Sequence, residues 1–204
     1  FYDGVIIVGE ALTDFALRYA AEARRLAAGE PDPVRRSELE TIARVCARVP
    51  AEPARTLHDA FQVLVFEQIL LNTESLDNSV SPGRLDHLLS PYFEADRDAG
   101  RASEEALHDL VGCYTVKLSE IVPVFSSRFT RVHGGMFNGQ VVVVGGQDSK
   151  GNDEVNELTW AFLDAMDELR MRQPNYHARI HSKSSDEYRQ RIASMLARGS
   201  ASPS

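Results

Sequence analysis

The sequence has little lysine and cysteine, and it lacks any long run of apolar residues. Lysine occurs only at Lys117, Lys150 and Lys183, and no cluster of basic residues alternates with aromatic ones, which argues against a nucleic-acid-binding protein. The net charge of -8 points the same way. No apolar run approaches the roughly 20 residues that cross a bilayer, and Asp3 and Glu10 bracket the short N-terminal apolar stretch. We therefore expect no nucleic-acid partner, no membrane segment and no signal peptide.

Cysteine occurs twice, at Cys46 and Cys113, and neither residue belongs to a CxxC pair. Both fall inside helical patterns, so we expect two reduced, buried thiols and a cytoplasmic protein. With 204 residues, of which 43% are hydrophobic, the chain can form the core of about one domain. Phe1 begins without a lead-in and the chain stops at GSASPS without a closing element, so we expect a fragment of a longer protein.

Motifs for several common chemistries are missing. There is no HExxH, and His177 and His181 lie four apart on a predicted strand, where that spacing does not converge on a metal as it does on a helix. No GxSxG elbow surrounds any serine. We therefore expect neither a zinc site nor a serine nucleophile.

Helical spacing of apolar residues dominates the first two thirds of the chain. It predicts helices over residues 10–30, 37–50, 56–74 and 103–121. Thr56, with Asp59 three residues on, is suited to cap the third helix, and Ser103 is suited to cap the fourth. Between them, residues 75–100 contain Pro82, Gly83, Pro91 and Gly100, which predict a structured loop with short helical turns.

The last third of the chain alternates strands and helices. Residues 140–144 form a continuous β-branched run, which is typical of a strand buried on both faces. Asp153 is suited to cap a helix over residues 154–172, and residues 175–181 alternate as a second strand. A strand, a helix and a strand form a crossover unit, which predicts parallel pairing and an α/β class. Ser184 and Glu187 have capping-box spacing for a final helix that Gly199 ends.

The glycine pair Gly145–Gly146 raises the possibility of a phosphate-binding turn. It matches neither GxGxxG nor GxxxxGK[ST], because Lys150 is followed by Gly151. Acidic residues at the start of the next helix would also repel a phosphate. We therefore interpret the pair as a tight turn out of a buried strand.

The strand predicted over residues 175–181 has one polar face. Asn175, His177, Arg179 and His181 share this face, and Tyr176, Ala178 and Ile180 share the other. A partly cationic face on an interior strand is costly unless its groups are paired or used. Either acidic neighbours on a helix satisfy these groups, or the face borders a cavity; the residue types alone leave both open.

Three long stretches together resemble the glycyl radical enzymes of the pyruvate formate-lyase family. IARVCARVPAEPARTLHDAFQ resembles the family's helix–VPxxPAxTFxEAxQ–helix run, and ESLDNSVSPGRLDHLLSPYFEADRDAG resembles its E…SxSxGRxDQYLYPYYxxD segment. FNGQVVVVGGQDSKGNDEVNELTWAFLDAMDELRMRQPNYHARIH resembles its FNxQxxxxGGxDxxGxDxTNELSxxxLEAxxxLRLxQPNLSVRxH segment. The three cover most of the chain in the family's order.

This resemblance implies a helix-rich α/β fold, part of a ten-stranded barrel in which helices wrap two parallel half-barrel sheets. Residues 1–204 are then an internal fragment of one domain, mainly helical over 1–130 and strand–helix–strand–helix over 131–204. The family's enzymes act on small molecules as formate C-acetyltransferases, dehydratases and lyases that break C–C, C–O, C–N or C–S bonds, and the parent is expected to be a homodimer. A catalytically inert helical binding or structural module derived from the same domain is the alternative.

The resemblance also implies that no catalytic group lies in this chain. An activase with S-adenosylmethionine and an iron–sulfur cluster makes the family's glycyl radical, which acts through a cysteine on a loop inside the barrel. Both positions are expected after Ser204, and Cys46 and Cys113 match neither. The fragment itself is therefore expected to bind no cofactor or metal directly and to be inactive alone.

The resemblance carries over a set of substrate-binding positions. Asn78 and Ser79 match a His-Ser pair that contacts substrate hydroxyls, and Met136 and Phe137 match an aromatic wall of the pocket. Because Asn78 replaces a histidine, it can donate and accept hydrogen bonds but cannot shuttle a proton, which argues against plain diol dehydration. Alternatively, the first pair caps a turn before Pro82. The further positions expected to be structural or to face the pocket are Arg84, Tyr176, His177, Arg179 and His181.

Overall fold

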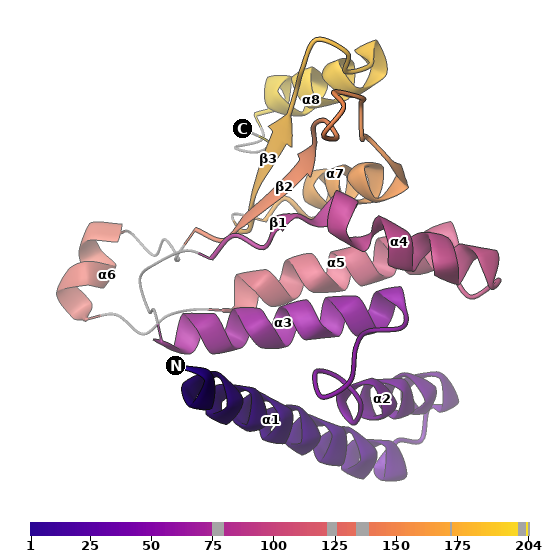
Figure 1. The fold of residues 1–204 in the computed structure, drawn as a ribbon, viewed down its shortest axis with the longest axis vertical. Helices are drawn as coiled ribbons and strands as arrows, with labels where there is room; N and C mark the ends of the chain where they lie inside the picture. Colours follow the sequence, from indigo (N-terminus) through magenta and orange to yellow (C-terminus); the bar gives the residue numbers. More distant parts are fainter. Residues whose placement is uncertain (75–79, 122–125, 134–138, 172, 200–202, 204) are drawn as a thin grey trace. The chain divides into compact units, whose positions relative to one another are not determined.

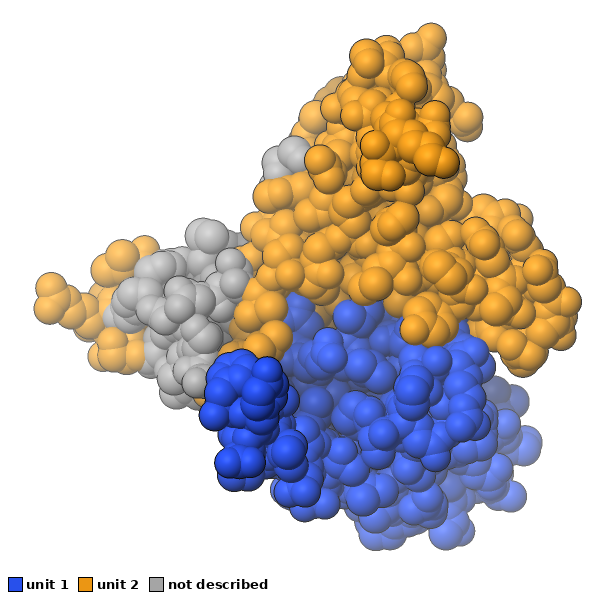
Figure 2. Space-filling model, in the orientation of Figure 1, with its two compact units in different colours: residues 1–70 blue, residues 71–204 orange. Residues whose placement is uncertain are grey.

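The computed structural model describes residues 1–74, 80–121, 126–133, 139–171, 173–199 and 203. Its helices are α1 (Tyr2–Gly29), α2 (Pro33–Cys46), α3 (Leu57–Glu74), α4 (Leu85–Asp98), α5 (Glu104–Glu120), α6 (Ser127–His133), α7 (Glu157–Leu169) and α8 (Asp186–Ala197) (Figure 1). Its strands are β1 (Gly83–Arg84), β2 (Val141–Gly145) and β3 (Asn175–Arg179). The chain divides into two compact units, Phe1–Leu70 and Leu71–Ser204 (Figure 2). Among the described helices, none combines the length and the apolar character that crossing a membrane requires.

The first unit is helical and packs around small side chains. Ala16 and Ala20 of α1 are buried with Cys46 of α2 and Phe66 of α3. Burial raises the pKa of the Cys46 thiol to about 11, so this cysteine stays protonated and behaves as a core residue. The expectation of burial is confirmed for Cys46, but it is wrong for Cys113, which lies on an exposed side of α5.

The start of α3 has the capping box that the sequence predicted. The Asp59 N–H donates to the Thr56 hydroxyl over 3.1 Å, and the Thr56 N–H donates to the Asp59 carboxylate over 3.0 Å. Arg48 forms an ion pair with the same carboxylate. Burial alone would raise the pKa of Asp59, but hydrogen bonds from Arg55, Arg48 and Thr56 outweigh it and lower the pKa. The helix start is therefore held by an ionised carboxylate.

The second unit is built on a parallel three-stranded sheet in the order β1-β2-β3. Gly83 of β1 pairs with Val142 of β2, and Val143 of β2 pairs with His177 of β3. Helix α7 connects β2 to β3 and lies beside the sheet (Figure 1). The predicted crossover and the α/β class are confirmed.

Residues 85–98 correct one prediction. We expected a loop, but α4 is a continuous helix with Pro91 inside it. Leu85, Leu89 and Phe93 recur every four residues and are all buried. Their burial offsets the roughly 3 kcal/mol that an interior proline costs a helix.

Two predicted helix caps are also wrong, because tertiary contacts use the expected residues. Asn156 caps α7 in place of Asp153, through reciprocal hydrogen bonds with Thr159. Ser185 caps α8 in place of Ser184, whose hydroxyl accepts the His181 N–H over 3.0 Å. The last predicted strand likewise ends at Arg179 rather than at residue 181.

Candidate functional site

One face of the sheet is covered by helices. Val142 and Val144 are fully buried, and Tyr176 is 1% exposed. The Tyr176 hydroxyl lies 2.7 Å from the Thr115 hydroxyl of α5, and its ring lies 6.1 Å from the ring of Phe162 in α7. Burial raises the pKa of Tyr176. Within this chain, Tyr176 is thus part of the core beneath the sheet.

The opposite face, which we call the open face, carries Val141 and Val143 of β2 with His177 and Arg179 of β3. The valines are half-buried, and the two basic residues are exposed. The predicted alternation of Asn175, His177 and Arg179 against Tyr176 is therefore confirmed. Parallel sheets are normally covered on both faces, so further protein or a ligand is expected over this one.

The polar groups of β3 and its extension fall into two classes. His181, beyond the strand end, is 11% exposed in its side chain and lies 2.9 Å from the Asp153 carboxylate. Within the part of the chain that the structure describes, no carboxylate pairs with His177 or Arg179. Acidic neighbours therefore satisfy His181, while the open-face pair borders uncovered space.

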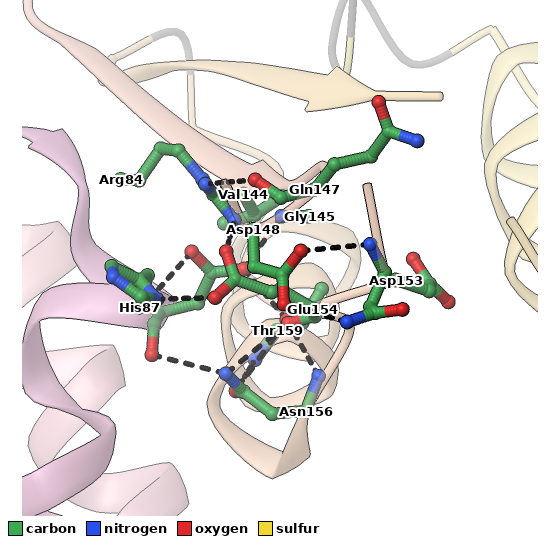
Figure 3. A network of polar contacts seen from close by, with 12 residues as sticks. Arg84, His87, Val144, Gly145, Gln147, Asp148, Asp153, Glu154, Asn156 and Thr159 are labelled. Carbon is green, nitrogen blue, oxygen red and sulfur yellow. Dashed lines mark hydrogen bonds and ion pairs between the residues drawn. The ribbon is translucent and has the colours of Figure 1, made fainter. Parts of the chain in front are cut away.

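A polar network joins the carboxyl end of β2 to α4 and α7 (Figure 3). At its centre, Asp86 is fully buried and accepts hydrogen bonds from the Gly145 N–H over 2.5 Å and the Thr159 hydroxyl over 2.7 Å. The His87 N–H donates to the same carboxylate over 2.8 Å. Burial raises the pKa of Asp86, although these hydrogen bonds offset part of the effect. Asp86 was not among the predicted site residues; an acidic residue within the apolar run LDHLL is the signal that could have identified it.

Arg84, one of the predicted positions, is engaged in the same network. Its guanidinium lies 2.6 Å from the Glu154 carboxylate and donates to the Gln147 carbonyl over 2.9 Å. The His87 ring lies 3.0 Å from the other oxygen of Glu154 (Figure 3). These contacts fix the loop that follows β2, so Arg84 has a positioning role within this chain.

The glycine pair after β2 lets two side chains pack closely against the backbone. Gly145 and Gly146 both have positive φ values. A Cβ on Gly145 would lie 2.4 Å from the Tyr188 hydroxyl, and one on Gly146 would lie 3.3 Å from Cδ of Arg179. The following turn is closed by Asp148, whose carboxylate accepts the N–H groups of Lys150 and Asn152. These amides are therefore occupied, which supports the interpretation of a tight turn over that of a phosphate site.

Asn78, Ser79, Met136 and Phe137, the predicted substrate-binding residues, lie outside the described residues. The chain that follows each pair is described, and it enters the sheet at one edge. The Ser81 hydroxyl donates to the Val141 carbonyl over 3.1 Å, and Gly83 pairs with Val142. Residues 81–83 and 141–142 therefore run side by side. Among the described residues, no group of three or more histidine, cysteine or acidic side chains is arranged to hold a metal ion.

The whole chain, residues 1–204, matches a family described as pyruvate formate lyase-like. Isethionate sulfite-lyase of Nitratidesulfovibrio vulgaris is 37% identical over 209 residues, which cover 100% of this chain and 25% of that protein. A glycyl radical enzyme from Archaeoglobus fulgidus superposes with a TM-score of 0.87 at 39% identity, over 93% of this chain and 24% of its own. The glycerol-bound B12-independent glycerol dehydratase from Clostridium butyricum superposes with a TM-score of 0.88 at 32% identity. The superposition covers 95% of this chain and 24% of the dehydratase chain. The chain thus spans about a quarter of the length of these relatives.

Proposed function

The chain belongs to the pyruvate formate lyase-like family of glycyl radical enzymes, and from this premise we propose that it forms part of the substrate pocket of a lyase. Its relatives include a sulfite-lyase, which breaks a C–S bond, and a dehydratase, which breaks a C–O bond. The proposed reaction is the cleavage of one such bond in a small polar molecule. Cleavage of C–C or C–N bonds, including chemistry of the formate C-acetyltransferase type, stays a broader prediction.

The pairing register of β1 with β2 carries this proposal. Gly83 lies opposite Val142, so the two strands begin at the same edge of the sheet. Ser79 precedes Gly83 by four positions, and Phe137 precedes Val142 by five. At about 3.3 Å per extended residue, neither pair can lie much more than about 20 Å from that edge. The two segments can therefore contribute to one pocket despite their separation in sequence.

We assign complementary roles to the two pairs. Asn78 and Ser79 would orient a hydroxyl or an anionic head by hydrogen bonds, because the amide and the hydroxyl both donate and accept. Met136 and Phe137 would exclude water from the reacting carbon. The glycyl radical that an S-adenosylmethionine-dependent iron–sulfur activase installs would supply the initial hydrogen abstraction. Both radical positions are proposed to lie in the rest of the protein, so this chain alone is expected to be inactive.

Turnover by the full-length protein tests this function. We would activate the protein anaerobically, verify the glycyl radical by electron paramagnetic resonance, and assay sulfite release from isethionate and aldehyde formation from 1,2-propanediol and glycerol. The proposal predicts turnover of at least one of these substrates. A full-length protein that carries the radical but converts none of them would contradict it, and failure to form any radical would favour the inert binding module. A cytoplasmic location and a homodimer stay predictions.

A further inference from the structure

We propose that His177 and Arg179 form an anion-binding pair on the open face, and that this pair recognises a sulfonate or carboxylate group of the substrate. The inference rests on the proposed function and deepens it, because it makes the substrate an anionic hydroxy compound. Four features of the described residues carry it: the seat of the Arg179 stem, the absence of a described counter-ion, the position of His177, and the distance to the pocket edge.

The aliphatic part of the Arg179 side chain packs against the backbone at Gly146. A Cβ built on Gly146 would lie 3.4 Å from Cβ, 3.3 Å from Cδ and 3.5 Å from Nε of that arginine. Any side chain there would push against the arginine, and the φ of +103° at Gly146 disfavours one in any case. The stem is therefore held along the backbone, and only the guanidinium stays free to bind. Holding the stem lowers the conformational entropy that ligand binding would otherwise cost.

Unlike Arg84, Arg191 and Arg198 of the same unit, Arg179 has no counter-ion among the described residues. Arg84, Arg191 and Arg198 each have a carboxylate oxygen at 2.5–2.6 Å. Two carboxylates of the loop between β2 and α7 already have partners, since Glu154 binds Arg84 and His87 while Asp153 binds His181. Once its face is covered, an unpaired guanidinium is costly, so an anion is expected there.

His177 adds a second donor to the same face. It lies two residues before Arg179, so the two Cα atoms are about 6.6 Å apart and their side chains stand on one side of the sheet. Its neighbour across the register is Val143, which offers no hydrogen-bonding group. Even a neutral imidazole has one N–H to donate, and guanidinium has five. An anion with several oxygens can accept from both at once.

The pair lies along β3 on the open face. Measured along β3 from Asn175, His177 lies about 7 Å and Arg179 about 13 Å from the edge where the chain enters the sheet. The positive charge of Arg179 also favours small anions over neutral analogues.

Calorimetric titration of the unactivated full-length protein tests the pair. The probes are isethionate and lactate as anions, and the variants are Arg179→Gln, Arg179→Lys and His177→Gln. Arg24→Gln, at an exposed arginine of α1 in the other unit, is the matched control. We expect Arg179→Gln to weaken binding of at least one anion by about 10- to 100-fold, as for a hydrogen-bonded charge pair. The anion affinity of Arg179→Lys should lie between those of wild type and Arg179→Gln. Arg24→Gln should leave the affinity unchanged.

Several results would overturn the pair. They are a wild-type protein that binds neither anion, and an Arg179→Gln variant that binds both as tightly as wild type does. If a protein carboxylate is the true partner, Arg179→Gln lowers the melting temperature without changing anion affinity. Lyase turnover with an unchanged affinity would leave the proposed function standing while removing the pair. Anion binding that depends on Arg179, in a protein without turnover, would do the reverse.

Discussion

Tyr176 and His177 are neighbours in sequence, but they lie on opposite faces of the sheet and in opposite environments. On the covered face, Tyr176 is buried against α5 and α7, and its hydroxyl has a hydrogen-bonding partner in Thr115. On the open face, His177 is exposed beside half-buried valines. Strand alternation thus lets five residues of β3 serve the core with one side and leave the other side free for a ligand. Substitution of Tyr176 should therefore mainly change stability, whereas substitution of His177 or Arg179 should mainly change substrate binding.

The two ends of the sheet differ in a similar way. At the carboxyl end, Asp86, Arg84 and Glu154 interlock the strands with α4 and the loop before α7. At the other end, the chain enters from the segments that contain the predicted substrate-binding residues. The carboxyl end thus carries this buried network next to Arg179, and the entry end leads from the segments in which we place the hydroxyl-binding residues.

The largest predicted effect contrasts the two faces of β3. Tyr176→Ala should destabilise the full-length protein by about 3–5 kcal/mol, because it empties a fully buried aromatic site. His177→Ala should change stability by less than about 0.5 kcal/mol, as exposed positions usually do, while lowering kcat/KM. Denaturant unfolding and steady-state kinetics of both variants check this. Equal destabilisation by the two would show that the open face is packed like the covered one.

The next effect concerns the carboxyl-end network. Asp86→Ala should cost about 2–4 kcal/mol, because it leaves the Gly145 N–H and the Thr159 hydroxyl buried without their acceptor. Asp86→Asn should cost less, since it keeps one oxygen. Thermal and denaturant unfolding measure both. If Asp86→Ala proves as mild as an exposed substitution, the network does not support the site.

The same residue makes a prediction about pH. Because burial raises the folded-state pKa of Asp86, the folded protein holds its proton more tightly than the unfolded chain does. The contribution of this linkage to stability is present below the unfolded pKa of about 3.9 and is lost as the pH rises through the folded pKa. Unfolding of wild type and Asp86→Asn from pH 4 to pH 7 should show this loss in wild type alone. Parallel pH profiles would contradict the assignment.

A comparison of Gly146 with Gly151 distinguishes the effect of backbone strain from that of packing against Arg179. Gly146 and Gly151 both have positive φ, but a Cβ on Gly151 would meet nothing closer than 3.9 Å. Alanine at either position should cost about 1–2 kcal/mol in backbone strain. Only Gly146→Ala should also weaken anion binding, because its methyl group displaces the arginine stem. Equal anion affinities in the two variants would show that the contact between Gly146 and Arg179 does not contribute to ligand binding.

The smallest predicted effect lies at the entry edge. Ser79→Ala should lower transition-state binding by about 0.5–1.5 kcal/mol, or somewhat more if the bound head is charged. Asn78→His should shift preference toward diols by restoring an imidazole. Steady-state kinetics on the activated full-length protein measure both. If neither variant changes kcat/KM or substrate preference, the two residues cap a turn and do not contact substrate.

The sequence predicted strands β2 and β3 well, because their signals are local, but it missed β1, which lies in the stretch expected to be a loop. The valine run of β2 and the alternation in β3 each occupy five residues, and the helix between them dictates parallel pairing. Helix α4 was missed because Pro91 and the flanking glycines read as loop residues, whereas burial of Leu85, Leu89 and Phe93 decides the outcome.

The details of the network could not be predicted for a different reason. Asp86 binds groups that lie 59 and 73 positions away, and no local pattern encodes such partners. The sequence pointed to Asp153 and Ser184 as the caps of α7 and α8, but His181 engages both, and Asn156 and Ser185 cap the helices instead. Tertiary contacts thus determine which polar residue caps each helix.

The central claim is that the open face of the sheet borders the substrate pocket. A crystal structure of the unactivated full-length protein with bound isethionate tests it most directly. We predict density for the sulfonate within hydrogen-bonding distance of Arg179 or His177, on the open face of the sheet. Isethionate bound elsewhere, with the open face covered by packed side chains of the protein itself, would contradict the account.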